Sequence, residues 1–185
     1  MRVISGMARG TKLYSLEGNN TRPTLDRVKE SLFNIIGMKV RNATFLDLFS
    51  GSGAIGIEAA SRGAEKVIFC DKSKDAINII NKNIEKTRLI ENTVIINSDY
   101  KQALKQANCT YDIIYIDPPY ATDLVKDSVD EILKNEYLKD SGIIILETDE
   151  EERINKELNE IKDKKIDIYD KRKYGRVMLI FLRKG

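Results

Sequence analysis

Hydrophobic and polar positions follow two alternating spacings along this 185-residue chain. Short apolar runs, rich in isoleucine and valine, have the length of buried strands. These runs are 44–48, 66–70, 93–97, 112–116 and 142–146. Apolar residues between the runs fall at helical spacing, as in Ile77, Ile80 and Ile84 after the capping residue Ser73. Strands that alternate with helices predict an α/β fold built on a mostly parallel, doubly wound sheet.

The end of the chain departs from this alternation. Two further apolar runs, 166–171 and 177–182, are separated by a turn at Tyr174 and Gly175. Because this connection is too short for a crossover helix, it predicts an antiparallel hairpin. The hairpin completes a seven-stranded sheet as its antiparallel edge.

The start of the chain is interpreted as an extension of a single domain. Residues 2–16 alternate in polarity and contain glycines, which predicts a short hairpin. One amphipathic helix follows and is expected to stop at Gly37. Residues 1–42 therefore form a basic extension, and residues 43–185 form the core of the domain.

Composition narrows the chemistry and the location. The chain has no histidine, which excludes a Ser-His or Cys-His nucleophile pair, a histidine general base and an HExxH zinc site. We expect Cys70 and Cys109 to be free thiols and the protein to hold no metal. No apolar run approaches the ~20 residues of a membrane-spanning helix, and the first residues lack a signal-peptide core. A cytoplasmic protein without membrane partners is the expectation.

The net charge of +2 is spread unevenly. Residues 1–42 carry +5, residues 43–170 carry −9 and residues 171–185 carry +6. Basic ends around an acidic middle suggest that a polyanion contacts both ends of the chain. Ordinary solvated lysines explain the same charges, so charge alone leaves both interpretations open.

A glycine-rich turn follows the first core strand. Gly51, Gly53 and Gly56 form a GxGxxG pattern, which lets the backbone turn sharply and approach a ligand closely. Asp71 ends the next strand, where a carboxylate accepts hydrogen bonds from ribose hydroxyls. The pattern fits a dinucleotide or S-adenosylmethionine, and it also fits a tight turn without a ligand.

Two further carboxylates help to choose between these ligands. Asp47 stands near the end of the first strand, where it suits the cationic ammonium group of S-adenosylmethionine and would sit poorly beside a pyrophosphate. Asp99 and Tyr100 follow the third strand, and they fit an adenine amino group and the adenine ring. A helix N-cap is the alternative interpretation of Asp99.

The sharpest signal is the sequence Asp117-Pro118-Pro119-Tyr120 at the end of the fourth strand. The prolines fix the backbone and remove two N–H donors. The Asp117 carboxylate and the Pro118 carbonyl then form a pair of acceptors that matches the two hydrogens of an exocyclic NH₂ group. The tyrosine ring offers a face on which a flipped or unpaired base stacks. A rigid turn with a surface tyrosine is the alternative.

Together these motifs resemble the RsmD family of 16S ribosomal RNA guanine-N2 methyltransferases. The resemblance covers nearly the whole chain, and its motifs are 21–24, 26–28, 32–35, 45–53, 58–64, 117–120 and 174–175. It implies a Rossmann-like class I methyltransferase fold that uses S-adenosyl-L-methionine and releases S-adenosyl-L-homocysteine. It further implies a guanine N2 substrate in 16S rRNA, within the small ribosomal subunit or its assembly intermediate.

The motifs and the resemblance together give three predicted sets of site residues, in a protein expected to be a monomer. The catalytic set is Asp117, Pro118, Pro119 and Tyr120. The cofactor-binding set is Asp47, Phe49, Ser50, Gly51, Ser52, Gly53, Asp71, Lys72, Ser73, Asp99 and Tyr100. The substrate-binding set is Arg22, Pro23, Thr24, Lys171, Arg172, Lys173 and Arg176.

Three other functions remain open from the sequence. The Asp-Pro-Pro-Tyr motif also serves adenine-N6 methylation of RNA or DNA. The glycine pattern with Asp71 also suits an NAD-dependent oxidoreductase, which leaves the motif at Asp117 unexplained. A non-catalytic RNA-binding assembly factor with a degenerate methyltransferase fold is the third, although intact motifs argue against degeneration.

Overall fold

The computed structural model describes residues 1–16, 24–119, 123–161 and 166–185. Seven strands form one sheet in the order β3-β2-β1-β4-β5-β7-β6. They are β1 Thr44–Asp47, β2 Lys66–Asp71, β3 Thr93–Asn97, β4 Tyr111–Ile116, β5 Leu138–Thr148, β6 Ile166–Tyr174 and β7 Val177–Lys184. The first five strands are parallel, and β7 runs antiparallel to β5 and β6. This confirms the predicted mostly parallel, seven-stranded sheet with an antiparallel C-terminal hairpin.

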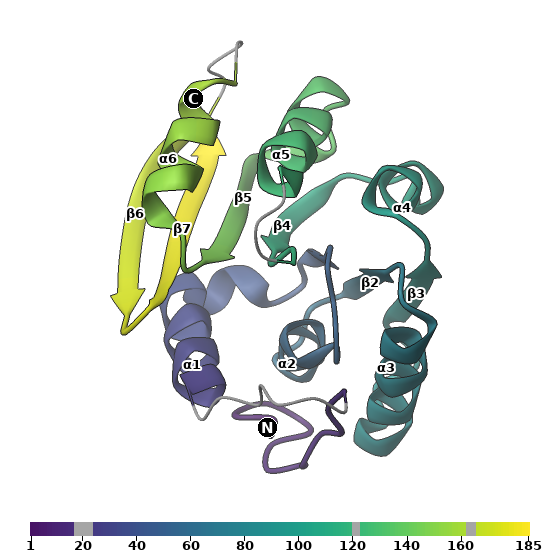
Figure 1. Cartoon of the computed structure of the whole chain (residues 1–185). Coiled ribbons are helices and arrows are strands. Elements are labelled where there is room, and N and C mark those ends of the chain that lie inside the picture. The colour runs from purple at the N-terminus through teal and green to yellow at the C-terminus, as the bar shows by residue number, and fades with distance from the viewer. Residues whose placement is uncertain (17–23, 120–122, 162–165) are drawn as a thin grey trace.

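The helices form two layers, one on each face of the sheet (Figure 1). They are α1 Thr24–Ile36, the 3-10 helix η1 Gly37–Val40, α2 Ala54–Ser61, α3 Lys74–Thr87, α4 Tyr100–Ala107, α5 Leu124–Lys134 and α6 Glu151–Asn159. The core on one face contains residues of α1, α2 and α3, and the core on the other contains residues of α4, α5 and α6. Among the described residues, no helix has the length and apolar character needed to cross a membrane.

Burial on both faces explains why the central strands are continuous apolar runs. Neighbouring residues of a strand point to opposite faces. In β1, Phe45 therefore packs with the core beneath α1, α2 and α3, while Leu46 packs with the other core. Both side chains are fully buried, as expected for a parallel sheet covered on both sides.

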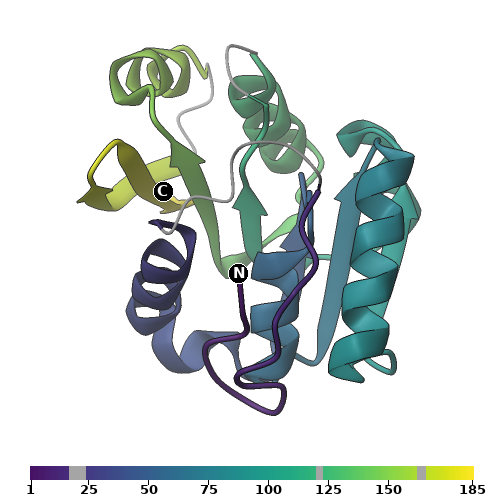
Figure 2. The same ribbon diagram turned by 60° about the horizontal axis from the view of Figure 1, so that its bottom comes forward.

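The N-terminal segment, residues 1–16, is less regular than the predicted hairpin. Its antiparallel pairing is reduced to one isolated bridge between Arg2 and Lys12. Hydrogen bonds to α2 hold the segment instead, since the Glu58 carboxylate accepts from the backbone N–H groups of Ile4 (2.8 Å) and Ser5 (3.0 Å). Figure 2 shows the segment, in dark purple, lying against α2 and beside α1. The prediction of two paired strands was therefore too regular.

Candidate active site

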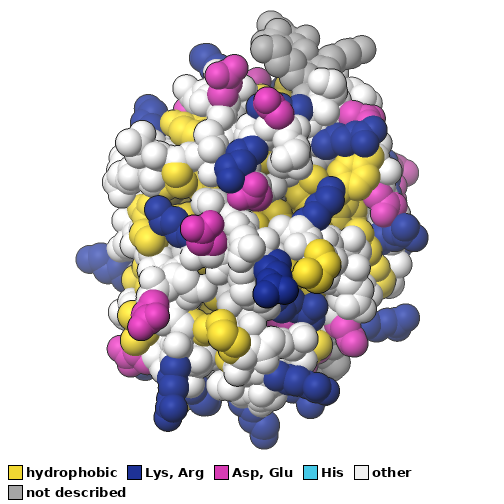
Figure 3. Space-filling view, turned by 180° about the vertical axis from the view of Figure 1, so that it is seen from behind, with side chains coloured by type: hydrophobic (Ala, Val, Ile, Leu, Met, Phe, Trp, Pro, Cys, Tyr) yellow, Lys and Arg dark blue, Asp and Glu magenta, His cyan; other side chains and the backbone are white. Residues whose placement is uncertain are grey.

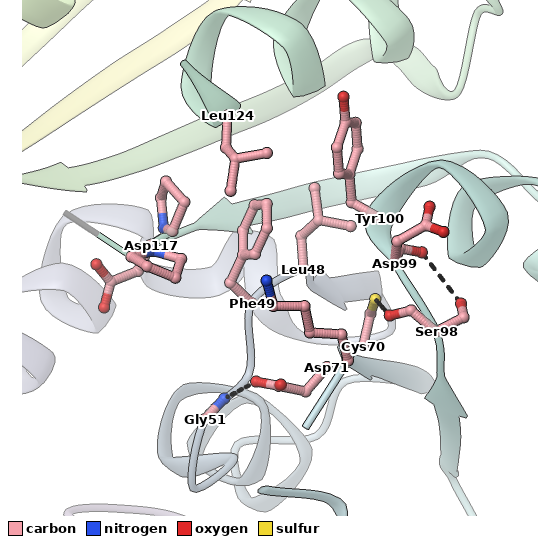
Figure 4. A pocket seen from close by; sticks show the side chains of 13 residues that line it. Leu48, Phe49, Gly51, Cys70, Asp71, Ser98, Asp99, Tyr100, Asp117 and Leu124 are labelled. Carbon is pink, nitrogen blue, oxygen red and sulfur yellow. Dashed lines mark hydrogen bonds between the residues drawn. The ribbon is translucent and has the colours of Figure 1, made fainter. Parts of the chain in front are cut away.

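A cavity of about 390 Å³ opens where the carboxyl ends of the central strands meet. Strand order reverses at β1, because β2 and β3 lie on one side of it and β4 and β5 on the other. Open α/β sheets bind ligands at such a switch point. The lining residues are Leu48, Phe49, Gly51, Cys70, Asp71, Lys72, Ser98, Asp99, Tyr100, Asp117, Pro118, Pro119 and Leu124 (Figure 4). We call this the cofactor cavity.

Side-chain and backbone hydrogen bonds fix the loop between β1 and α2. The Ser50 hydroxyl donates to the Asp47 carbonyl (2.6 Å) and accepts from the Cys70 backbone N–H (3.0 Å). Gly53 has φ of +76° and serves as the N-cap of α2, a conformation that favours glycine. The loop is thus tied to β1 and β2 and forms one wall of the cofactor cavity at Gly51.

Asp47 is the last residue of β1, and its side chain lies at the N-terminal end of α2. Its side chain is almost fully buried, and Oδ2 accepts a hydrogen bond from the Gly56 backbone N–H at 3.0 Å. Burial raises the pKa of this carboxyl to about 7, the Gly56 hydrogen bond opposes the rise, and the charge of Asp71 adds to it. An anionic pyrophosphate at this helix end would meet a carboxylate, so the arrangement favours a ligand that carries a cation here.

Asp71 connects the loop to the second strand. Its Oδ2 accepts from the Gly51 N–H (2.9 Å), and its Oδ1 accepts from the Ser73 N–H (2.8 Å). These bonds hold the carboxylate at the rim of the cofactor cavity, which it lines. Each oxygen keeps a second lone pair with which to accept a ligand hydroxyl.

Asp99 fits both of its sequence interpretations. Its Oδ1 accepts from the Gln102 N–H at 3.0 Å and caps α4, and the residue also lines the cofactor cavity. Beside it, the Tyr100 and Phe49 rings lie 6.1 Å apart between centroids with a 43° angle between their planes. This end of the cavity therefore combines a carboxylate with two aromatic rings, a combination that suits a purine.

Asp117 lines the cofactor cavity and also a second, smaller cavity that is described below. It follows β4, is half-buried, and lines the cofactor cavity together with Pro118 and Pro119. Burial raises the pKa of the Asp117 carboxyl well above its usual range, and the negative charges of Glu147 and Asp47 raise it further. Such a carboxyl group takes up a proton more readily than an ordinary aspartate does.

A second cavity of about 180 Å³ lies on the other side of Asp117. Its lining residues are Met1, Lys29, Asp47, Phe49, Ser50, Gly51, Ser52, Ala54, Ile55, Tyr115, Asp117 and Glu147. We call it the acidic cavity, after the carboxyl groups of Asp47, Asp117 and Glu147. The Tyr115 hydroxyl donates a hydrogen bond to Glu147 Oε2. Within the described part of the chain, no three acidic or cysteine side chains are arranged to hold a metal ion.

Most of the predicted site residues lie at these two cavities, and some do not. Gly53 and Ser73 line neither cavity and act as N-caps of α2 and α3. Tyr120, Arg22 and Pro23 lie outside the described residues, as does the side chain of Thr24, the first residue of α1.

Sequence reasoning missed several lining residues. Among them, Glu147 follows the apolar run of β5, so the strand-end rule that selected Asp71 and Asp117 would have found it. Cys70 gave no such signal, because a buried thiol is an ordinary core residue. Burial, with nearby aspartates, raises the pKa of its thiol to about 12, which makes it unreactive.

The basic residues near the β6–β7 turn divide into two groups. Lys171 pairs with Glu151 on α6 (3.8 Å), and Arg172 pairs with Asp170 (3.1 Å). All four residues are exposed, but Lys173 and Arg176 form no ion pair with the described residues. On the face shown in Figure 3, Lys and Arg side chains are dispersed and interleaved with acidic ones, so that face has no single basic patch.

Comparisons with known proteins identify the family. The model of a family described as "Conserved hypothetical protein 95" matches residues 1–183. The Bacillus subtilis protein named "Putative rRNA methyltransferase YlbH" is 40% identical over 154 residues, which cover 82% of this chain and 84% of that protein. Ribosomal RNA small subunit methyltransferase D of Haemophilus influenzae is 36% identical over 154 residues, covering 82% and 80%. This chain belongs to the RsmD family.

The fold of this RsmD-family chain matches solved methyltransferase structures. It aligns with the structure titled "Putative methyltransferase yhhF from Escherichia coli" at a TM-score of 0.84 and 26% identity, covering 100% of this chain and 98% of that one. The Rossmann-like class I methyltransferase fold predicted from the sequence is therefore confirmed. These relatives are named as methyltransferases, so the comparisons favour that class over an oxidoreductase.

Proposed function

We propose that this chain transfers the methyl group of S-adenosylmethionine to the N2 amino group of a guanine in 16S rRNA of the small ribosomal subunit. Relatives named ribosomal RNA small subunit methyltransferase D support small-subunit rRNA as the substrate. The guanine N2 position is what the resemblance to the RsmD family implies. The observation that carries the proposal is the position of Asp117, which lines both the cofactor cavity and the acidic cavity. A group that borders both cavities can hold an acceptor base beside a methyl donor that extends from the cofactor cavity to Asp47 in the acidic cavity.

The residues present fit S-adenosylmethionine. In the cofactor cavity, Asp71 suits the ribose hydroxyls, and Asp99 beside the ring of Tyr100 suits the adenine. The buried carboxyl of Asp47 suits the ammonium group of the methionine end, because a cation there relieves the cost of a buried negative charge. When bound, S-adenosylmethionine supplies an electrophilic methyl group on a positively charged sulfur.

The chain's own contribution to the reaction is orientation and proton acceptance. The Asp117 carboxylate and the Pro118 carbonyl accept the two hydrogens of the amino group, which turns the nitrogen lone pair toward the methyl group. With S-adenosylmethionine bound, transfer of its methyl group to the nitrogen would release S-adenosylhomocysteine and one N–H proton. Asp117 is suited to take that proton, because burial and neighbouring carboxylates raise its pKa.

Product identification tests this proposal. Small subunits that lack the modification are incubated with the enzyme and methyl-labelled S-adenosylmethionine, and the digested RNA is analysed by mass for methylated nucleosides. We expect N2-methylguanosine in 16S rRNA. Methyladenosine would overturn the guanine assignment in favour of adenine-N6 methylation. No transfer to subunits, free rRNA or DNA, together with retained RNA binding, would favour the non-catalytic assembly factor.

A further inference from the structure

Four side chains of the acidic cavity project from the same face of the sheet because of strand register. Asp47 in β1 pairs with Tyr115 in β4, so their side chains point to the same side. Asp117 is the first residue after β4, and it lines the same cavity as Tyr115. Ile116 pairs with Leu146, which brings Asp117 and Glu147 to the same level at the ends of two adjacent parallel strands.

This arrangement gives the cavity a deep end and a rim. Asp47 and Tyr115 are almost fully buried, whereas Asp117 and Glu147, one step further along their strands, are only half-buried. The deep end at Asp47 is the part that suits the ammonium group of the methyl donor. The rim at Asp117 and Glu147 is the part that a base can reach from outside.

Glu147 is held at the rim rather than left to rotate freely. Its Oε2 accepts the hydrogen bond of the buried Tyr115 hydroxyl. The negative charge of Glu147 also contributes to the raised pKa of Asp117, so the two carboxyl groups lie within electrostatic reach of each other. Two neighbouring carboxyl groups at one rim, of which Glu147 is oriented by Tyr115, form a surface of hydrogen-bond acceptors.

The Watson–Crick edge of guanine complements such a surface. Its N1–H and N2–H₂ groups are adjacent donors, so two carboxylates can accept from both. Adenine presents the N6–H₂ donors beside N1, which is an acceptor, and a carboxylate opposite N1 would face a lone pair. Enzymes that act on flipped bases read this edge through hydrogen bonds. An unpaired buried acceptor makes the wrong base unfavourable.

We propose that Glu147 determines base specificity by accepting the N1–H of the target guanine while Asp117 accepts an N2 hydrogen. This inference rests on the proposed function, because it names the residue that selects the substrate of the same site. It also gives a physical reason for guanine over adenine in a chain whose Asp117 motif suits either exocyclic amino group.

The test uses an RNA in which 2-aminopurine replaces the target guanine. This base keeps the 2-amino group, but its N1 is an acceptor instead of a donor. Wild type should prefer guanine over 2-aminopurine in kcat/KM, by roughly 10- to 100-fold for one well-placed hydrogen-bonded pair. Glu147→Gln, whose amide N–H can donate to N1, should lower kcat/KM for guanine, raise it for 2-aminopurine and so reduce that preference to below about threefold.

A cofactor measurement and a control variant separate this role from others. Affinity for S-adenosylhomocysteine should stay within about twofold of wild type in Glu147→Gln. Asp149→Asn removes an exposed charge that also acts on Asp117 but lines neither cavity, and it should leave the guanine preference unchanged. An unchanged preference in Glu147→Gln would overturn the inference. A large loss of cofactor affinity with that preference unchanged would instead assign Glu147 to the methyl donor.

The same measurements distinguish a failure of the proposed function from a failure of the inference about Glu147. If wild type forms no N2-methylguanosine, the proposed function fails. If wild type forms it, but Glu147→Gln discriminates between guanine and 2-aminopurine as wild type does, only the inference about Glu147 fails.

Discussion

The Asp47 carboxylate accepts a 3.0 Å hydrogen bond from the backbone N–H of Gly56, in the first turn of α2. Asp47 is 1% exposed, and burial raises the pKa of its carboxyl group to about 7. The ordinary value in an unfolded chain is about 4. The folded state therefore favours the protonated form. The stability that follows from this is fully present below about pH 4 and is lost as the pH rises through 7.

Asp47→Asn should remove this pH dependence. Asparagine keeps an acceptor for the Gly56 N–H and cannot ionise. At pH 8 the free energy of unfolding should exceed that of wild type by on the order of 2–4 kcal/mol, and the gap should narrow as the pH falls toward 4. Urea unfolding at several pH values measures this. Asp130→Asn, at an exposed position of α5, serves as the control. Identical pH profiles for Asp47→Asn and wild type would contradict the account.

Glycine is required at position 56 because the Phe69 ring lies too close for a side chain there. A Cβ atom on Gly56 would lie 2.3 Å from Phe69 Cε1 and 2.8 Å from Cζ. Gly56→Ala should therefore destabilise the protein by about 1–3 kcal/mol through overpacking. Thermal or urea unfolding of Gly56→Ala, Phe69→Leu and the double variant tests this. The double variant should recover part of the loss, and strictly additive losses would show that the ring is not the cause.

The buried ion pair between Lys29 and Glu58 anchors the N-terminal segment. Their side chains are 2% and 0% exposed, and Lys29 Nζ lies 3.5 Å from Glu58 Oε2. Glu58→Gln leaves the lysine charge buried without its main counter-charge and should destabilise the protein by about 3 kcal/mol or more. Adding Lys29→Met should recover part of that loss in urea unfolding. Simple additivity in this double-mutant cycle would mean that the pair is not coupled.

Exposed Lys173 and Arg176 at the β6–β7 turn are the residues expected to contact rRNA phosphates. Replacing both by glutamine should weaken rRNA binding and reduce the slope of log affinity against log salt by about 2. Filter binding at several salt concentrations measures both quantities. Lys82→Gln with Lys105→Gln, exposed positions on α3 and α4, is the matched control. An equal effect of both double variants would indicate that only total charge matters.

The strands and most helices could be predicted because burial on both faces leaves continuous apolar runs between helical repeats. The N-terminal segment could not be predicted in the same way. It is held by bonds to residues distant in sequence, such as those from Ile4 and Ser5 to Glu58, more than 50 residues away. Local alternation predicted a hairpin where contacts with α2 determine the conformation.

Some site residues could also be predicted from the sequence, and others could not. Residues at strand ends, such as Asp71 and Asp117, could be predicted because parallel strands end at one edge of the sheet. The acidic cavity depends on β5 lying beside β4 in a register that places Glu147 next to Asp117, and on Lys29 of α1 reaching the same cavity. The strand-end rule could have selected Glu147 as a candidate, but sequence spacing shows neither its position next to Asp117 nor the approach of Lys29.

The most direct test of the account is methyl transfer by Asp117→Ala, measured beside its affinity for S-adenosylhomocysteine. We predict that transfer to unmodified small subunits falls by at least about 100-fold, while cofactor affinity stays within a few-fold of wild type. Asp117→Asn, which keeps one acceptor oxygen, should retain more transfer than Asp117→Ala. Turnover by Asp117→Ala at the wild-type rate would contradict the assignment of Asp117 as the residue at which the amino group is held.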